Sequence, residues 1–585
     1  MIHRDGGGSP EPAGRTSRSP LISSTDVRTD GADSRPRAAG QARVAVAWVA
    51  AALVVAAVVR LPRSLADDFP INDGGIFFVM VNELVGAGLA LPPVTSYNGA
   101  AIPFAYPPFA PCLAAALHAA TGASVLGLLR FLPLTANLAT VAVCFFLCRR
   151  VLGTPLRAGL ATLIVVLLPR SYEYLIMGGG LTRSFGFLFA CCAIACGWRF
   201  FAERRLAAGI ATAVALALSA LSHPEMGLWA AASLALVGAA SGPSRRTLAA
   251  AAAAAAGAAV LASPWWVAVL ARHGIGPFLA ASETSAWSAH ALLGVFSRGV
   301  GGEVGRAPFA ILGLVGFVDA VVRRELLVPA WLAATFVVVP RSAPTAAVVP
   351  LGLLAARALL DVVFPALERP AASLSRRWRV TPVETGREAR WGARWLVRAA
   401  VLAPVFGYTI VASNLARTPA AWPSMSRVSP AEREAMAWVA ANVSADSRFV
   451  VLSASRDWWT DPVGEWFPAI AGRTSVATPN GTEWIPRGEF ARRLRARAEL
   501  RSRRAVSAEF LDDWSARFSM EFTHVYVSKA GTQGPAAGGV PSVALGAGGA
   551  FAVVYDGPGA TVFARRRAGV EPAPPGIPPR GAAAS

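Results

Sequence analysis

Long apolar runs, separated by short polar segments, occupy most of the chain up to residue 415. A helix needs about 20 apolar residues to cross the hydrocarbon core of a bilayer. The runs predict about eleven membrane-spanning helices, at residues 43–60, 124–148, 156–170, 184–202, 206–221, 226–241, 247–264, 308–322, 325–339, 344–364 and 396–414. The pattern therefore predicts a mainly α, polytopic membrane bundle over residues 42–415, preceded by a disordered cytoplasmic tail at 1–41.

Arginine clusters recur at every second junction between the runs, namely Arg149–Arg150, Arg204–Arg205, Arg245–Arg246, Arg323–Arg324 and the arginine-rich segment 368–395. Positive residues near membrane spans concentrate on the cytoplasmic side. One assignment places all of these clusters inside, with the N-terminus in the cytoplasm and the end of the last span outside. The alternation predicts a multi-pass cell-membrane protein with an extracytoplasmic C-terminal domain.

Residues 61–123 depart from this pattern because they contain several acidic residues, many prolines and two short apolar runs, at 75–88 and 107–120. Each run is marginal for a bilayer crossing of roughly 30 Å. We expect a long first external loop with short helices at the membrane interface.

The composition changes again beyond Pro423, where polar and β-branched residues predict a soluble α/β domain at 424–567. Ser429 and Glu432, with Pro430 between them, form the signature of a capped helix start. The pattern predicts helices at 430–443, 488–504 and 507–518, strands at 449–452 and 522–528, and a hairpin at 551–555 and 560–564. A loose tail at 568–585 is expected to follow.

Composition supports the membrane assignment. Hydrophobic residues make up 54% of the 585 positions, charged residues 15%, and the mean hydropathy is +0.47. These values exclude a large soluble globule and a disordered chain. The net charge of +20 is spread over short clusters, which indicates membrane topology and contact with lipid rather than nucleic-acid binding.

Acids, bases and arginines collect on the expected external face, and Asp73 is the first candidate among them. It lies in Asn72-Asp73-Gly74-Gly75, directly before an apolar run. A partly desolvated carboxylate here is a suitable proton acceptor, although Asp-Gly-Gly is also common in turns and helix caps. Asp67 and Asp68 are either ligands of a divalent cation through their hard oxygens or solvated loop residues.

A second candidate turn runs from Arg170 to Arg183 and contains Glu173 and the glycines 178–180. The planar fork of arginine suits phosphate oxygens, and the glycines permit close backbone approach. The alternative is a glycine-rich loop with a surface ion pair between Arg170 and Glu173. Arg341 is a further arginine on this face.

Other polar residues on this face have two interpretations each. Tyr106, before Pro107–Pro108, either shapes the floor of a cleft or begins a short helix. Arg130 either snorkels to the headgroups or turns inward to hold a phosphate. His223 and Glu225, separated by a proline, form either a proton relay or ligand pair, or a capped turn between helices.

Four tryptophans stand among acidic residues in the C-terminal domain: Trp458, Trp459, Trp466 and Trp484. They predict either a sugar-stacking or membrane-facing surface or ordinary core packing.

The order of these features resembles the type C (GT-C) superfamily of membrane glycosyltransferases, which use polyprenyl-phosphate-linked sugars. The features are an acidic residue in a long first external loop (Asp68 or Asp73), the turn Tyr106-Pro107-Pro108, an early arginine in the next span (Arg130) and a doubled arginine at its end (Arg149–Arg150). A C-terminal α/β domain beyond the last span is also similar to many superfamily members.

The resemblance implies transfer of a sugar, with inversion, from a polyprenyl phosphate to a glycan, lipid or protein acceptor of the cell envelope. It implies that Asp73 or Asp68 acts as the base, with Mg²⁺ or Mn²⁺ as a possible cofactor and no other cofactor expected. The donor phosphate would be bound by external arginines, namely Arg130, Arg170, Arg183 and Arg341. The substrate cleft would be lined by Tyr106, Glu173, His223 and Glu225. A lipid or solute transporter or flippase, and a non-catalytic envelope scaffold, are the alternatives.

Overall fold

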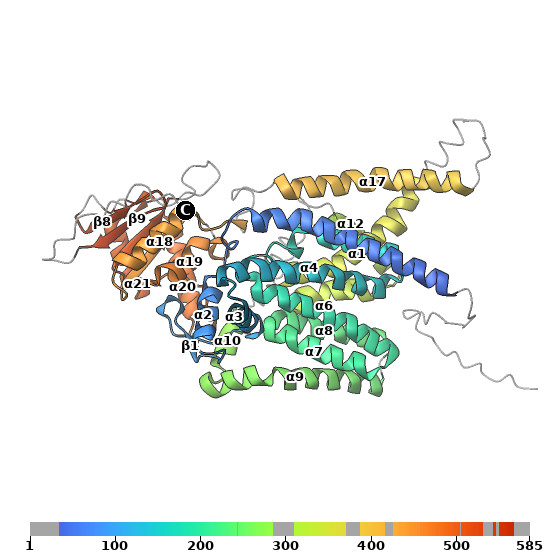
Figure 1. Ribbon diagram of the computed structural model, residues 1–585, viewed down its shortest axis with the longest axis horizontal. Helices are drawn as coiled ribbons and strands as arrows, with labels where there is room; N and C mark the ends of the chain where they lie inside the picture. The colour runs from blue at the N-terminus through green and yellow to red at the C-terminus, as the bar shows by residue number, and fades with distance from the viewer. Residues whose placement is uncertain are drawn as a thin grey trace, which may run out of the picture.

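The computed structural model describes residues 34–242, 244–284, 309–369, 387–415, 425–455, 457–503, 505–529, 542–543, 545 and 549–566. A long helical bundle carries an α/β domain at one end (Figure 1). Most of the expected N-terminal tail and all of the tail at 568–585 lie outside the described residues, whereas 34–41 belong to the first helix.

The bundle has a helix at every position where a span is predicted. These helices are α1 (Ser34–Leu65), α4 (Val125–Leu152), α5 (Pro155–Leu167), α6 (Gly180–Glu203), α7 (Leu206–Ser222), α8 (Pro224–Ala240), α9 (Arg245–His273), α12 (Phe309–Val322), α13 (Leu327–Val338), the continuous stretch of α14 (Ala343–Ala346), α15 (Val348–Arg357) and the π-helical turn η3 (Ala358–Val363), and α17 (Arg387–Leu415). In the described part of the chain, 5 helices are long and apolar enough to cross a membrane. The count of eleven crossings remains a prediction.

The helices of the bundle lie side by side, with the C-terminal domain at one end (Figure 1). The doubled arginines stand at the opposite end, in the last turn of α4, between α6 and α7, at the start of α9 and directly after α12. We call these two ends the domain end and the arginine end. Ion pairs at the arginine end join separate helices. In one bidentate pair, Arg157 donates to both carboxylate oxygens of Asp361, at 3.0 and 2.7 Å.

The first loop lies between the bundle and the C-terminal domain (Figure 1). Its two short apolar runs form α2 (Gly75–Gly86) and α3 (Phe109–Thr121), which pack on each other. The strands β1 (Val94–Thr95) and β2 (Ile102–Pro103) pair antiparallel between them, beside the turn η1 (Tyr97–Gly99).

The C-terminal domain is built on a five-stranded sheet of order β4-β3-β6-β9-β8. Its strands are β3 (Arg448–Leu452), β4 (Thr474–Ser475), β6 (His524–Ser528), β8 (Phe551–Asp556) and β9 (Ala560–Arg565), and its helices are α18 (Pro430–Asn442), α19 (Pro462–Ala471), α20 (Glu489–Ser502) and α21 (Ala508–Phe518). β4, β3 and β6 are parallel, whereas β9 and β8 form an antiparallel hairpin. The predicted capping box of Ser429 and Glu432 is present, but α19 and β4 occur where no element is expected.

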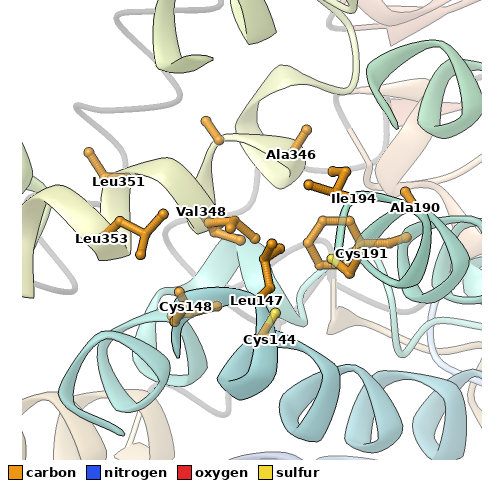
Figure 2. Close-up of a cluster of buried hydrophobic side chains, with 14 of the residues drawn as sticks. Cys144, Leu147, Cys148, Ala190, Cys191, Ile194, Ala346, Val348, Leu351 and Leu353 are labelled. Atoms are coloured by element: carbon orange, nitrogen blue, oxygen red, sulfur yellow. The ribbon is translucent and has the colours of Figure 1, made fainter. Parts of the chain in front are cut away.

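Two main apolar cores stabilise the structure. The first fills the bundle, where Cys144, Cys148 and Cys191 pack with apolar side chains of α4, α6 and α15 as small core residues (Figure 2). The second is shared between the loop and the C-terminal domain, because Phe77 of α2 and Trp466 of α19 belong to the same buried cluster. The C-terminal domain is therefore packed onto the first loop.

Candidate active site

The residues that precede α2 are held against α19. A Cβ atom on Gly75 would lie 2.7 Å from the carbonyl oxygen of Glu465, so the two backbones approach as closely as glycine allows. The indole Nε1 of Trp466 donates to the carbonyl of Asn72 at 2.8 Å, and its ring lies 4.6 Å from that of Phe69. The C-terminal domain thus fixes the backbone on both sides of Asp73.

Asp73 joins the first loop to the glycine-rich turn before α6. Its Oδ1 accepts from the backbone N–H of Gly179 at 2.9 Å, and its Oδ2 lies 3.3 Å from Nη2 of Arg183. A Cβ on Gly178 would stand 2.1 Å from the Asp73 carbonyl oxygen, so a glycine is required there. The N-cap of α2 is Gly74, and no side chain caps this helix. The Asp73 carboxylate therefore does not cap α2 and is directed toward the start of α6.

A second carboxylate, which the sequence analysis did not select, lies beside Asp73. Glu465 of α19 accepts from the N–H of Gly74 at 2.9 Å and is only 3% exposed. Burial raises the pKa of Glu465 well above its usual range, and the charge of Asp73 raises it further. Arg183 interacts with both carboxylates and opposes this rise in the pKa of Glu465.

The ends of α7, α8 and α13 add further charged groups to this cluster. His223 lies between α7 and α8, and Glu225 stands in the first turn of α8. Glu225 interacts electrostatically with Arg341, with His223 and with Arg183, and accepts a hydrogen bond from Ser342. The structure therefore brings together Asp73, Arg183, His223, Glu225 and Arg341, all of them residues that the sequence singled out.

Tyr106 forms the aromatic side of this cluster. Its ring lies 5.2 Å from Phe77 and 5.1 Å from Trp484. Tyr106 interacts electrostatically with Arg341 and with Glu483, a second acidic residue that the sequence analysis did not select. α3 begins directly after Pro108, so the Tyr-Pro-Pro turn both leads into a helix and places Tyr106 beside the charges.

Two predicted arginines make other contacts. Arg130 donates to the backbone carbonyls of Ser64 and Asp67 and so ties α4 to the first loop. Arg170 pairs with Glu173 at 3.5 Å and lies over the ring of Tyr174, at 4.9 Å. These contacts join both arginines to residues other than Asp73.

Asp67 and Asp68 lie apart from Asp73 and face the C-terminal domain. Arg433 of α18 lies 2.8 Å from Asp68 and 3.8 Å from Asp67. The hydrogen bond with Asp67, and then the one with Arg433, lower the pKa of Asp68 to about 2. Its side chain is 73% exposed, which indicates a surface clamp between loop and domain.

The acidic residues of the first loop lack the donor set of a metal site. Across the ranges that the structure describes, no three His, Cys, Asp or Glu side chains converge as a metal ion requires, and Arg433 already pairs with Asp67 and Asp68. These residues do not fit a divalent cation site, so no step is assigned to a metal.

The two missed carboxylates share a sequence signal. Glu465 and Glu483 each directly precede a tryptophan, in Gly464-Glu465-Trp466 and Thr482-Glu483-Trp484. A buried acid beside a large aromatic residue is unusual, and this pattern could have marked both.

No protein-family model matches the sequence, and no curated protein matches it. Solved structures do match. The oligosaccharyltransferase of Archaeoglobus fulgidus in its apo form aligns with a TM-score of 0.52 and 13% identity, over 83% of this chain and 69% of that one. The same enzyme, AglB, in complex with an inhibitory peptide and a dolichol-phosphate gives a TM-score of 0.51, with the same identity and coverage.

A variant of the arabinofuranosyltransferase AftD from Mycobacteria aligns with a TM-score of 0.50 and 16% identity, over 89% of this chain and 41% of that one. At these identities the likeness concerns the fold. The chain therefore shares its fold with these solved transferases, in line with the resemblance to the type C superfamily.

Proposed function

We propose that the protein transfers a sugar from a polyprenyl-phosphate carrier to a hydroxyl group of a cell-envelope acceptor, at the domain end of the bundle. The observation that carries this proposal is the contact of Asp73 with Arg183, next to Arg341, where loop, bundle and C-terminal domain meet. A carrier of this kind places its phosphate at headgroup depth. The shared fold adds support, since AglB has been solved with a dolichol-phosphate.

The arrangement supplies the groups that such a transfer needs. Asp73 accepts the proton of the acceptor hydroxyl, whose oxygen attacks the anomeric carbon of the sugar. The bond from that carbon to the phosphate oxygen breaks on the opposite face, so the configuration inverts and the polyprenyl phosphate leaves. Arg183, in the first turn of α6, and Arg341 stabilise the charge of the departing phosphate.

The test compares two neighbouring carboxylates. Purified protein is incubated with radiolabelled polyprenyl-phosphate sugars and an envelope fraction, and transfer of label is measured. Asp73→Asn is expected to lower the rate by at least about 100-fold, which is the usual contribution of a general base. Asp68→Asn is the matched control and is expected to retain activity, because Asp68 is exposed and held by Arg433.

Two results would contradict the proposal. Full activity of Asp73→Asn would remove Asp73 from the reaction. Movement of intact labelled lipid across vesicles, with no cleavage of its sugar–phosphate bond, would support the transporter alternative instead.

A further inference from the structure

Glu483 projects from the C-terminal domain into the charged cluster. It lies in the short turn η6 (Thr482–Trp484), and the residue is only 6% exposed. The backbone N–H groups of Gly481 and of Glu483 itself donate hydrogen bonds to its carboxylate. Its Oε2 is buried and has no hydrogen-bond partner among the described residues. A buried acceptor of this kind costs stability unless a ligand satisfies it.

Aromatic rings stand beside this carboxylate. Trp484 lies 5.1 Å from Tyr106 and 6.4 Å from Phe278 of the short helix α10 (Gly276–Glu283). Phe278 in turn lies 5.6 Å from Trp265 of α9. Trp265 is 7% exposed, and within the described residues its buried Nε1–H has no acceptor.

We call the contacting rings of Tyr106 and Trp484 the Tyr106–Trp484 wall. The charged groups beside it distinguish it from an ordinary apolar core. Glu483 interacts electrostatically with Arg341 and with Arg183, the two arginines assigned above to the phosphate. A group seated against Glu483 would therefore stand beside that phosphate. A sugar ring combines hydroxyl donors and acceptors with apolar C–H faces, which suits an orphan carboxylate oxygen beside aromatic rings.

We propose that Glu483 and the Tyr106–Trp484 wall bind the sugar of the lipid-linked donor, with Oε2 of Glu483 accepting a hydrogen bond from a sugar hydroxyl. This inference rests on the proposed function and makes Glu483 a determinant of sugar specificity. Burial raises the pKa of Glu483 against the opposing effect of Arg341, which favours a neutral hydroxyl over an ammonium group as its partner.

Binding, rather than turnover, tests this assignment. The full-length protein in detergent is titrated with bare undecaprenyl phosphate and with undecaprenyl phosphates that carry glucose, mannose or arabinofuranose. Wild type is expected to bind at least one sugar-bearing lipid more tightly than the bare carrier. Glu483→Gln keeps an oxygen for the backbone N–H groups but presents an NH₂ in place of Oε2. It is expected to lose about tenfold in affinity for that sugar lipid and to bind the bare carrier like wild type.

Two controls separate hydroxyl recognition from a folding defect. Glu509→Gln changes an exposed glutamate of α21 in the same domain and is expected to alter neither affinity. Deoxyfluoro analogues of the preferred lipid replace one sugar hydroxyl at a time. One of them is expected to bind wild type about tenfold less tightly and to show no further loss with Glu483→Gln, because both changes remove the same hydrogen bond.

Each remaining outcome contradicts one of the two proposals in particular. If wild type binds neither bare nor sugar-bearing lipid, the proposed function itself fails. If the bare carrier binds but no sugar increases its affinity, or if Glu483→Gln keeps the full preference, the sugar assignment is overturned and the proposed function stands.

Discussion

At the scale of single residues, the site depends on how Asp73 and Glu465 share their surroundings. The Glu465 carboxylate accepts a hydrogen bond from the N–H of Gly74, and the Asp73 carboxylate accepts one from the N–H of Gly179. Arg183 interacts with both. Burial and the charge of Asp73 both favour the protonated form of Glu465, while Arg183 lies 3.3 Å from the Asp73 carboxylate.

The raised pKa of Glu465 predicts a pH-dependent stability difference. A carboxyl group whose pKa is raised on folding supports the folded state fully below its ordinary pKa of 4.5 and loses that support as the pH rises through the raised value. Glu465→Gln stays neutral, so its melting temperature relative to wild type is expected to increase from about pH 4.5 upward. Thermal unfolding of both proteins in detergent, followed across a pH series, measures this. Curves that stay parallel at every pH would contradict the assignment.

At the scale of elements, the contact between α2 and α19 positions the whole site. Nearly every residue of α19 is buried, and its Trp466 packs against Phe69 and Phe78 of the first loop. Because Gly75 faces the backbone of Glu465, a larger residue there cannot be accommodated by rotation of a side chain.

Two glycines of α2 provide a matched test of this contact. The Cβ of Gly75→Ala would meet backbone atoms of Glu465 and Trp466, whereas the Cβ of Gly86→Ala would meet nothing within 4 Å. Gly75→Ala is expected to cost about 1–3 kcal/mol through overpacking and to reduce transfer activity by displacing Asp73. Gly86→Ala is expected to be close to neutral. Unfolding midpoints and activity are measured on both, and equal effects would show that the α2–α19 contact is not critical.

The same elements explain what the sequence could and could not predict. The long apolar runs and the arginine clusters between them predicted every helix of the bundle. Turn and cap residues predicted α18 and the β8–β9 hairpin. α19 was missed because it has no exposed polar face and carries Pro462 and Pro468, so only tertiary packing reveals it. The roles of Glu465 and Glu483 were missed because they depend on docking against loop residues, which for Glu465 stand almost 400 positions earlier in the chain.

At the scale of the whole molecule, charge is divided between the two ends of the bundle. The arginine end carries the doubled arginines, whereas Glu225 and Glu483 gather around Arg183 and Arg341 at the domain end. A cell-envelope acceptor requires the domain end to lie outside the cytoplasm. The positive-inside rule, applied to the doubled arginines, predicts the same orientation.

Cysteine labelling tests this orientation directly. Glu509→Cys reports on the C-terminal domain, and Arg205→Cys, whose wild-type side chain is 67% exposed, reports on the arginine end. The native Cys144, Cys148 and Cys191 are buried in the bundle core (Figure 2), and the parent protein gives the background. A membrane-impermeant maleimide is expected to label position 509 in intact spheroplasts and position 205 only after lysis. The reverse pattern would place Asp73 and its arginines in the cytoplasm, where no envelope acceptor could reach them.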